Sequence, residues 1–324
     1  RRCQPTQRGN FHIEVKMNAL EKTLVKMKKN NVRCECNCTF EKLTTLGCGG
    51  KIYLTLFPES VSQLVFVAKY LYRHKITHCF LGHGSNVLAS DDFYNGVAVV
   101  TSFVRDFSVQ GDTVVASCGM STSKLCSQLV NRGLTGGEFF GCLPATVGGA
   151  VVCNAGCFGQ SVQDVVQSVV VLHNGKREKL SKEQCRFVKR GSIFKNNGDF
   201  LVLQVKMRFE KSTPAKVQEK LSQMRQKKAA TQPLGCRSAG CVLFNDKIAL
   251  SKLIDEAHLK GYRVGGAQVS EKHAGFVINL DKATSTDIYL LIRYIKKTLA
   301  EKFGVSAKLE VCLVNFPTDA EQLF

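Results

Sequence analysis

The chain of 324 residues lacks the long hydrophobic runs that would place it in a membrane. No apolar stretch approaches the roughly 18 to 20 residues that cross a bilayer, because Lys69 interrupts residues 64–72. The first 30 residues also lack a continuous apolar segment of about 7 to 15 residues, so we expect no secretory signal. Only 6 prolines, with 44% hydrophobic residues, exclude a disordered or collagen-like chain. The length allows two or three packed domains.

Fifteen cysteines would indicate a disulfide scaffold in a short secreted chain. Here the number is odd, the chain is large and an export signal is missing, so we expect reduced thiols in a cytoplasmic protein. Cys34, Cys36 and Cys38 alternate along the chain without the paired spacing of zinc modules, so no metal site is expected. The first residue is Arg1 rather than Met, and Met17 is a candidate initiator.

Acidic residues are scarce, since 26 Asp or Glu stand against 45 Lys or Arg, for a net charge of +19. Residues 1–33 hold nine Lys or Arg and two Glu, and residues 206–228 hold eight and two. Such clusters are typical of nucleic-acid surfaces, of solvated basic helices and of enzymes that attract anionic substrates. A nucleic-acid surface would interleave aromatic residues. These segments contain only Phe11 and Phe209, so no nucleic-acid partner is expected.

Hydrophobic periodicity predicts a mixed α+β protein. Helices are expected at residues 17–31, 58–72, 121–132, 214–228 and 284–303. Strands are expected at residues 51–57, 77–82, within 96–117, and at 165–172, 176–180, 200–209 and 307–314. Asn174-Gly175 predicts a tight hairpin, and Gly304 predicts the end of the clearest helix.

Two glycine-rich loops are the most informative local feature. Gly82-His83-Gly84-Ser85-Asn86 follows an expected strand, and its glycines allow close approach of the main chain to a phosphate. It is not a Rossmann fingerprint, because GxGxxG fails at Val87. A structural turn is the competing interpretation of this loop. The second stretch, residues 136–159, contains PATVGGA and NAGCFG. Two separate loops of this kind favour a ligand that carries a pyrophosphate.

The motifs GHGSNVLASD, LPATVGGAVVCNAGCFG, KRGSIFK, RSAGCV and VSEKHAGFVIN follow one another in the chain. In this order they resemble the UDP-N-acetylenolpyruvoylglucosamine reductase (MurB) family, over residues 45–316. The resemblance implies a two-lobe FAD-binding fold of the vanillyl-alcohol-oxidase (PCMH) type, with a C-terminal α+β domain that binds the UDP-sugar. The short link between Lys195 and Lys211 is similar to the compact type of the family, which lacks an extra tyrosine-bearing loop.

The resemblance also implies a division of the chain and a reaction. The expected parts are a basic arm at 1–33, two FAD-binding lobes at 34–95 and 96–210, and a substrate-binding domain at 211–324. The family reaction reduces an enolpyruvyl ether to a lactyl ether with NADPH and FAD, in the synthesis of peptidoglycan precursors. The chain is expected to act as a monomer on a UDP-sugar.

Three residues are expected to carry the chemistry. Arg190 matches the family's arginine, and a guanidinium can hold a carboxylate and stabilise an enolate-like intermediate. Glu310 matches the family's glutamate, which would orient or relay the proton. Cys241 stands where the family has a serine that protonates the substrate, and a thiol can do the same. Without the resemblance, a surface arginine, a solvated glutamate and a buried cysteine would be the simpler interpretations.

Further residues are carried over as binding residues. The FAD-binding set is Gly82, Gly84, Ser85, Asn86, Thr146, Gly149, Asn154 and Gly159. The substrate-binding set is Asn245, Lys272 and His273. The sequence departs from the family at Lys189, where a tyrosine is usual. Alternative functions are another FAD oxidoreductase that uses oxygen, a UDP-sugar-binding pseudoenzyme, and a basic nucleic-acid-binding protein.

Overall fold

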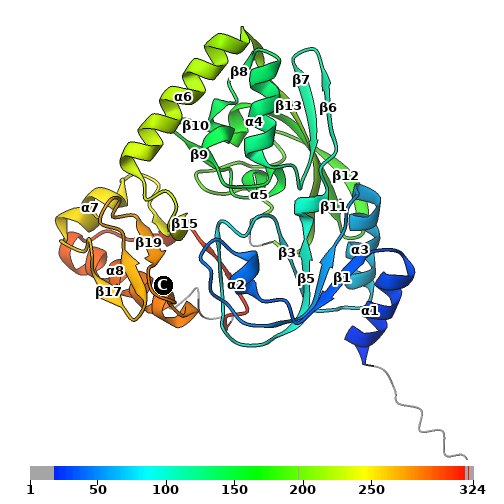
Figure 1. The fold of residues 1–324 in the computed structure, drawn as a ribbon, viewed down its shortest axis with the longest axis horizontal. Coiled ribbons are helices and arrows are strands. Elements are labelled where there is room, and N and C mark those ends of the chain that lie inside the picture. The colour runs from blue at the N-terminus through cyan, green and yellow to red at the C-terminus, as the bar shows by residue number, and fades with distance from the viewer. Residues whose placement is uncertain (1–17, 196, 318–319, 321–324) are drawn as a thin grey trace, which may run out of the picture.

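A computed structural model describes residues 18–195, 197–317 and 320. Arg1, Met17 and most of the predicted basic arm lie outside the described residues. Three lobes surround the centre of the molecule, and α6 (Pro214–Thr231) runs from the second lobe toward the third (Figure 1). Within the described residues, no helix has the length and hydrophobicity that a membrane span requires.

The first lobe is a four-stranded sheet in the order β1-β2-β5-β3. Its strands are β1 (Arg33–Cys36), β2 (Ile52–Phe57), β3 (His78–Leu81) and β5 (Tyr94–Val100). Its other elements are α1 (Ala19–Lys29), α2 (Phe40–Leu43), α3 (Val61–Arg73) and β4 (Val87–Ala89). β5 lies between β2 and β3 and is parallel to both. The predicted strand–helix–strand unit is confirmed, since α3 connects the parallel strands β2 and β3.

The predicted start of this helix at Pro58 is wrong by three residues. The helix begins at Val61, and Ser60 is its N-cap. The Ser60 Oγ accepts a hydrogen bond from the Gln63 amide at 3.2 Å. Because this hydrogen bond satisfies a free amide of the first turn, Ser60 rather than Pro58 determines where the helix starts.

The second lobe is an antiparallel five-stranded sheet in the order β12-β11-β13-β7-β6. Its strands are β6 (Phe107–Gln110), β7 (Thr113–Ser117), β11 (Val166–His173), β12 (Lys176–Ser181) and β13 (Phe200–Arg208). The predicted hairpin at Asn174-Gly175 is confirmed, and both residues have positive φ, at 48° and 74°. The remaining elements up to residue 211 are η1 (Thr101–Phe103), α4 (Thr122–Asn131), β8 (Leu134–Thr135), η2 (Glu138–Cys142), α5 (Val147–Val152), β9 (Gly156–Cys157), β10 (Gln160–Ser161), η3 (Val162–Asp164) and β14 (Glu210–Lys211).

The third lobe follows α6 and contains a small antiparallel sheet in the order β15-β19-β18-β17. Its elements are β15 (Arg237–Cys241), β16 (Leu243–Phe244), α7 (Leu250–Glu256), β17 (Arg263–Val264), β18 (Ala267–Val269), β19 (Phe276–Asn279) and α8 (Ser285–Phe303). The predicted long helix is confirmed as α8. A capping box of Thr284 and Asp287 begins it, and Gly304, with φ of 62°, ends it.

The single strand predicted at residues 307–314 is wrong. The structure has two short strands, β20 (Lys308–Leu309) and β21 (Cys312–Val314). β20 pairs with β16 of the third lobe, whereas β21 pairs in parallel with β4 of the first lobe. The chain changes partners between them, so pairing stops at residues 310–311. Glu310 therefore lies where the first and third lobes meet.

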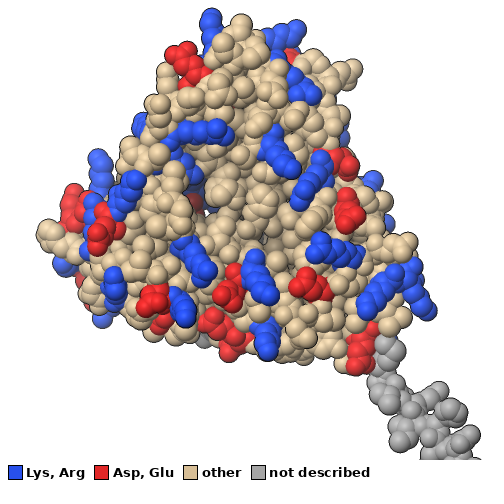
Figure 2. Space-filling view, viewed as in Figure 1, with Lys and Arg blue, Asp and Glu red and all other residues tan. Residues whose placement is uncertain are grey.

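Two large groups of buried residues hold these lobes together. One spans the first two lobes and includes Met27 of α1 and Leu221 of α6. The other belongs to the third lobe and also includes Leu46 and Leu88 from the first. Lys and Arg side chains are spread over all the lobes on the face shown in Figure 2, rather than gathered in one patch. The four-part division of the chain stays a prediction.

Candidate active site

An ion pair between Arg190 and Glu310 occupies the junction of the lobes. The Arg190 Nε lies 2.8 Å from the Glu310 Oε1, and the two side chains are 32% and 17% exposed. The Arg190 Nη1 also donates to the Gly156 carbonyl at 3.1 Å. A half-buried guanidinium is therefore fixed from two sides, by a carboxylate and by the glycine-rich segment.

The local backbone explains how Arg190 reaches this position. Val188 and Gly191 exchange two main-chain hydrogen bonds of 3.0 and 3.1 Å, which close a tight turn. Arg190 lies within the turn with φ of 58°, in the left-handed region that residues with a Cβ seldom adopt. Such a conformation costs free energy and persists only where its surroundings restrain it.

Cys241 lies at the end of β15, beside both members of the ion pair. Gly240, with φ of 79°, precedes it, and the pairing of β15 with β19 is irregular between Ser238 and Cys241. Burial and the Glu310 carboxylate raise the pKa of Cys241 to about 12, against an opposing effect of Arg190. The thiol therefore stays protonated at neutral pH. The structure thus brings the three predicted catalytic residues together.

Lys195 is a fourth member of this cluster, which the sequence interpretation missed. Its Nζ donates to the Arg190 carbonyl at 3.1 Å and to the Glu310 carbonyl at 3.3 Å. Burial raises the pKa of Glu310, while the charges of Arg190, Lys195 and Lys189 lower it. Lys195 closes the motif KRGSIFK, so its position five residues after Arg190 was the available signal.

The two glycine loops meet beside this cluster. A Cβ at Gly82 would lie 2.4 Å from the Thr146 Oγ1, so only glycine allows this approach. Burial lowers the pKa of His83, and a hydrogen bond to the main chain of Pro144 opposes that shift. Loops from the first and second lobes therefore contact each other directly.

The donors in these loops fit a pyrophosphate. Among the described residues, no acceptor is found for the consecutive main-chain amides of His83, Gly84 and Ser85. Successive unpaired amides form an anion-binding concavity. The Thr146 Oγ1 caps α5 by accepting from the Gly149 amide at 3.3 Å. A Cβ at Gly159 would meet open space.

Two asparagines of the predicted FAD set also bond within the protein. The Asn86 Nδ2 donates to the Glu310 carbonyl at 3.1 Å, and so joins the first glycine loop to the catalytic cluster. The Asn154 Nδ2 donates to the Val188 carbonyl at 2.9 Å, which connects the second loop to the turn that carries Arg190. Their roles toward FAD stay predictions.

The predicted substrate residues are placed less uniformly. His273 lies near Cys241, because a Cβ at Gly275 would be 3.2 Å from the His273 Cε1 and 3.1 Å from the Cys241 Sγ. The Asn245 Nδ2 donates to the Ser306 carbonyl at 2.8 Å, and the Lys272 Nζ donates to the Ala229 carbonyl at 2.6 Å. Lys189, at the family's tyrosine position, donates to the Asn245 carbonyl at 2.9 Å. The structure therefore places His273 close to Cys241, whereas the side chains of Asn245 and Lys272 donate to main-chain carbonyls.

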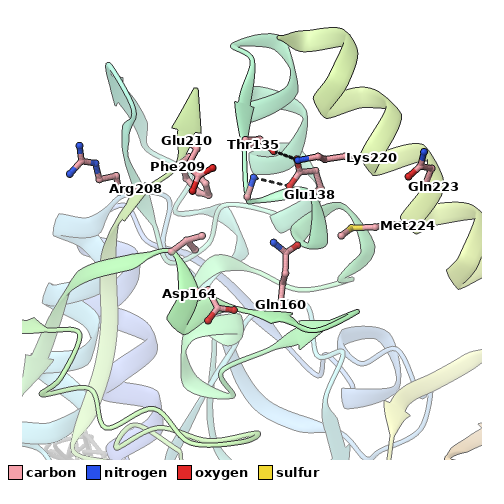
Figure 3. Close-up of a pocket in the computed structure, with 12 residues that line it drawn as sticks. Thr135, Glu138, Gln160, Asp164, Arg208, Phe209, Glu210, Lys220, Gln223 and Met224 are labelled. Atoms are coloured by element: carbon pink, nitrogen blue, oxygen red, sulfur yellow. Dashed lines mark hydrogen bonds between the residues drawn. The ribbon is translucent and has the colours of Figure 1, made fainter. Parts of the chain in front are cut away.

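A separate cavity of about 510 Å³ lies against α6. Glu138 points into it and accepts from the Thr135 Oγ1 and the Gly136 amide, and Gln160 points toward the same space (Figure 3). None of the predicted catalytic or FAD-binding residues lines it. In the described part of the chain, no group of three or more His, Cys, Asp or Glu is arranged to hold a metal ion.

Two known protein families match two consecutive parts of the chain. Residues 53–181 match the FAD binding domain family. Residues 183–314 match the C-terminal domain of UDP-N-acetylenolpyruvoylglucosamine reductase. The predicted FAD-binding architecture with an additional C-terminal domain is thereby confirmed.

Individual proteins agree with these families. A UDP-N-acetylenolpyruvoylglucosamine reductase of Caldanaerobacter subterraneus is 36% identical over 281 residues, which cover 86% of this chain and 93% of that protein. A UDP-N-acetylenolpyruvoylglucosamine reductase 2 of Bacillus anthracis is 34% identical over 274 residues, covering 84% and 90%. The crystal structure of the reductase (MurB) from Thermus caldophilus superposes with a TM-score of 0.74 at 26% identity, covering 88% and 99%.

Proposed function

Because the chain belongs to the UDP-N-acetylenolpyruvoylglucosamine reductase (MurB) family, we propose that it reduces UDP-N-acetylglucosamine enolpyruvate to UDP-N-acetylmuramate. The reductant is NADPH, the cofactor is FAD, and the product is a peptidoglycan precursor. The family predicted from the sequence is confirmed by relatives that are 34% and 36% identical over most of the chain. The match to the FAD binding domain confirms the predicted cofactor.

One observation carries the proposal beyond family membership. The Arg190–Glu310 ion pair and the Cys241 thiol lie together although they come from three distant segments. Reduction of an enolpyruvyl double bond places negative charge beside a carboxylate and requires a proton at the neighbouring carbon. A fixed guanidinium and a protonated thiol meet these two requirements.

Arg190 is the group that binds the substrate carboxylate. Its Nε is held by Glu310 and its Nη1 by Gly156, so its orientation is set before substrate arrives. Within the residues that the structure describes, its Nη2 has no acceptor. This free donor is available to the substrate, and it stabilises the charge that develops in the enolate-like intermediate.

Cys241 is the proton donor. A thiol with a pKa of about 12 keeps its proton at neutral pH until a strongly basic carbon is present. The thiolate that remains lies near the Arg190 guanidinium, whose charge lowers the pKa of Cys241 and stabilises that anion. Glu310 orients Arg190 and relays a proton back to the thiolate.

The glycine loops are the proposed FAD site. Gly82, Gly84, Ser85 and Asn86 line it from the first lobe, and Thr146, Gly149, Asn154 and Gly159 line it from the second. The unpaired amides at 83–85 would hold the pyrophosphate. Bound FAD supplies the hydride chemistry between NADPH and the substrate. We propose that Asn245, Lys272 and His273 contact the UDP-sugar.

The cellular setting follows from the substrates. NADPH and nucleotide sugars are cytoplasmic metabolites, so we propose a cytoplasmic enzyme. The three catalytic residues come from one chain, which is compatible with a monomer. The basic charge of the protein favours the approach of polyanionic substrates.

A visible absorption spectrum of the purified protein tests this function. We expect a flavin peak that NADPH bleaches without oxygen and that the enolpyruvyl UDP-sugar then restores. A peak restored by oxygen but not by the UDP-sugar would indicate an oxidase of the same flavin fold. Binding of the UDP-sugar without restoration of the peak would indicate a pseudoenzyme. A protein that retains no flavin would contradict the proposal.

A further inference from the structure

Lys195 connects the main chains of the two residues that form the ion pair. Its Nζ lies 3.1 Å from the Arg190 carbonyl and 3.3 Å from the Glu310 carbonyl. The same ammonium lies 5.7 Å from the centre of the Phe244 ring in β16. One half-buried cation thus joins the second lobe to the C-terminal segment and to the third lobe.

Both residues that Lys195 contacts lie in backbone that needs restraint. Arg190 has φ of 58°, which a residue with a Cβ adopts at a cost. Glu310 lies in the break between β20 and β21, where its amide donates to the Val242 carbonyl at 2.9 Å, while its carbonyl accepts from the side chains of Lys195 and Asn86. The Asn86 Nδ2 is a second donor to the Glu310 carbonyl, at 3.1 Å. Without Lys195, the Arg190 carbonyl would lose a charged donor and the Glu310 carbonyl would keep only the Asn86 side-chain amide.

We propose that Lys195 is a positioning residue that sets the distance between Arg190 and Glu310, and with it the placement of the substrate carboxylate and of the Cys241 thiol. This inference rests on the proposed reductase function. Lys195 acts through main-chain oxygens, so its contribution concerns the geometry of the reacting groups. A small misplacement of such groups slows a reaction by up to about 100-fold.

The charges around Glu310 give a second readout. Arg190, Lys189 and Lys195 face it from the segment 189–195, and each lowers its pKa. Cys241 faces it from β15, and Cys153 faces it from the end of α5. Removing the Lys195 charge should therefore raise the pKa of Glu310, and the carboxylate would be lost at a higher pH on acidification. A lysine whose charge did not act on Glu310 would not move this limb.

The experiment compares Lys195→Met with the wild type in rapid-reaction measurements. We expect Lys195→Met to retain FAD and to be reduced by NADPH within about threefold of the wild-type rate. Reoxidation by the enolpyruvyl UDP-sugar should slow by about 10-fold to 100-fold. The acid limb of reoxidation should move to higher pH. Lys195→Arg keeps the charge and should recover most of the rate.

Two further variants control the result. Lys220→Met removes a lysine whose Nζ donates to the Thr135 Oγ1 at 3.0 Å, away from the cluster, and should react like the wild type. Lys195→Gln keeps a hydrogen-bond donor without the charge, which decides the question if Lys195→Met does not fold. We expect an intermediate rate and the same shift of the acid limb.

The possible outcomes separate the two proposals. If the wild-type flavin is not reoxidised by the UDP-sugar, the reductase function fails. If the wild type reacts and Lys195→Met or Lys195→Gln matches its rate and acid limb, only the role of Lys195 is overturned. Loss of FAD from a folded Lys195→Met protein would assign the lysine to cofactor retention and would also overturn its positioning role.

Discussion

The catalytic cluster and the glycine loops lie side by side but are built from different parts of the chain. The cluster of Arg190, Cys241 and Glu310 uses side chains from three distant segments. The loops at 82–86 and 144–159 use main-chain amides and the absence of side chains. Substitutions in the cluster should therefore change the chemistry, and substitutions in the loops should change cofactor binding and stability.

Several hydrogen bonds join the two regions, and among them the Asn86 Nδ2 of the first loop donates to the Glu310 carbonyl at 3.1 Å. The Arg190 Nη1 donates to the Gly156 carbonyl at 3.1 Å, so the second loop helps to orient the catalytic guanidinium. Catalysis and cofactor binding are therefore only partly separate in this structure. Variants at the two sites measure whether a change in the cluster also affects FAD binding, and whether a change in the loops also affects catalysis.

The largest effect is expected from Arg190→Met. The variant removes the cation that stabilises the developing charge, and losing one such donor costs about 10² to 10³ in rate. Reoxidation of reduced flavin by the UDP-sugar should slow by that factor, while FAD content stays at the wild-type level. Stopped-flow absorbance measures the rate, and the ratio of flavin to protein absorbance measures the content.

Arg208→Met is the matched control for this variant. Arg208 also pairs through its Nε with a carboxylate, Asp112, at 2.9 Å, but its side chain is 64% exposed and lies on β13. An exposed pair contributes about 0 to 1 kcal/mol, so both half-reactions should be unchanged. Release of FAD from Arg190→Met would show that the cluster and the loops cannot be separated.

A smaller effect is expected from Cys241→Ala. Loss of a general acid should slow reoxidation of the flavin by about 10² or more and leave reduction by NADPH unchanged. Cys241→Ser should keep measurable turnover, because a hydroxyl can also donate a proton. Cys185→Ala removes a fully buried thiol outside the site and should not affect either half-reaction. An unchanged rate of reoxidation in Cys241→Ala would exclude the thiol as the proton donor.

The pKa of Cys241 adds a pH test to this variant. The thiol should lose its proton only near pH 12, since burial and Glu310 raise its pKa to about that value. Wild type and Cys241→Ser should therefore show no loss of reoxidation rate between pH 7 and pH 10 that depends on this position. A fall in the wild type near pH 9, absent from the serine variant, would show that the thiol titrates normally.

The sequence predicted long elements well and short ones poorly. The helix α8 was found from its apolar stripe and its caps, and β11, β12 and β13 from their length and the Asn174-Gly175 turn. The strands β17 and β18 hold two and three residues, which is too short for any alternation to be visible. The break at Glu310 was missed because two different partners, β16 and β4, decide it.

The site divides in the same way. Arg190, Cys241 and Glu310 were identified because each lies in a motif that resembles the family, although their contacts were not visible in the sequence. Lys195 was missed because its contacts are to main-chain oxygens, which leave no pattern in residue types. The glycine positions were visible, but the reason for each depends on a neighbour from another segment, such as Thr146 for Gly82.

The last comparison tests why glycine is needed at particular positions of the loops. Gly84→Ala should destabilise the protein and release FAD, because Gly84 has φ of 60° and a Cβ there would lie 2.1 Å from the Leu43 carbonyl oxygen. The left-handed backbone alone costs about 1–2 kcal/mol for alanine. The overlap also requires the main chain to move away from the loop. Thermal unfolding and flavin content measure the two effects.

Gly111→Ala separates these contributions, and so decides whether close approach or backbone conformation makes glycine necessary. Gly111 has nearly the same φ, 61°, but a Cβ there would meet nothing within 4 Å. The stability of this variant should fall only because alanine adopts a left-handed backbone there, which lowers Tm by a few degrees, and the protein should keep its FAD. If Gly84→Ala lost no more stability than Gly111→Ala and kept its flavin, the loop would not depend on close approach. The contrast between a site of side chains and a site of main chain would then fail at this residue.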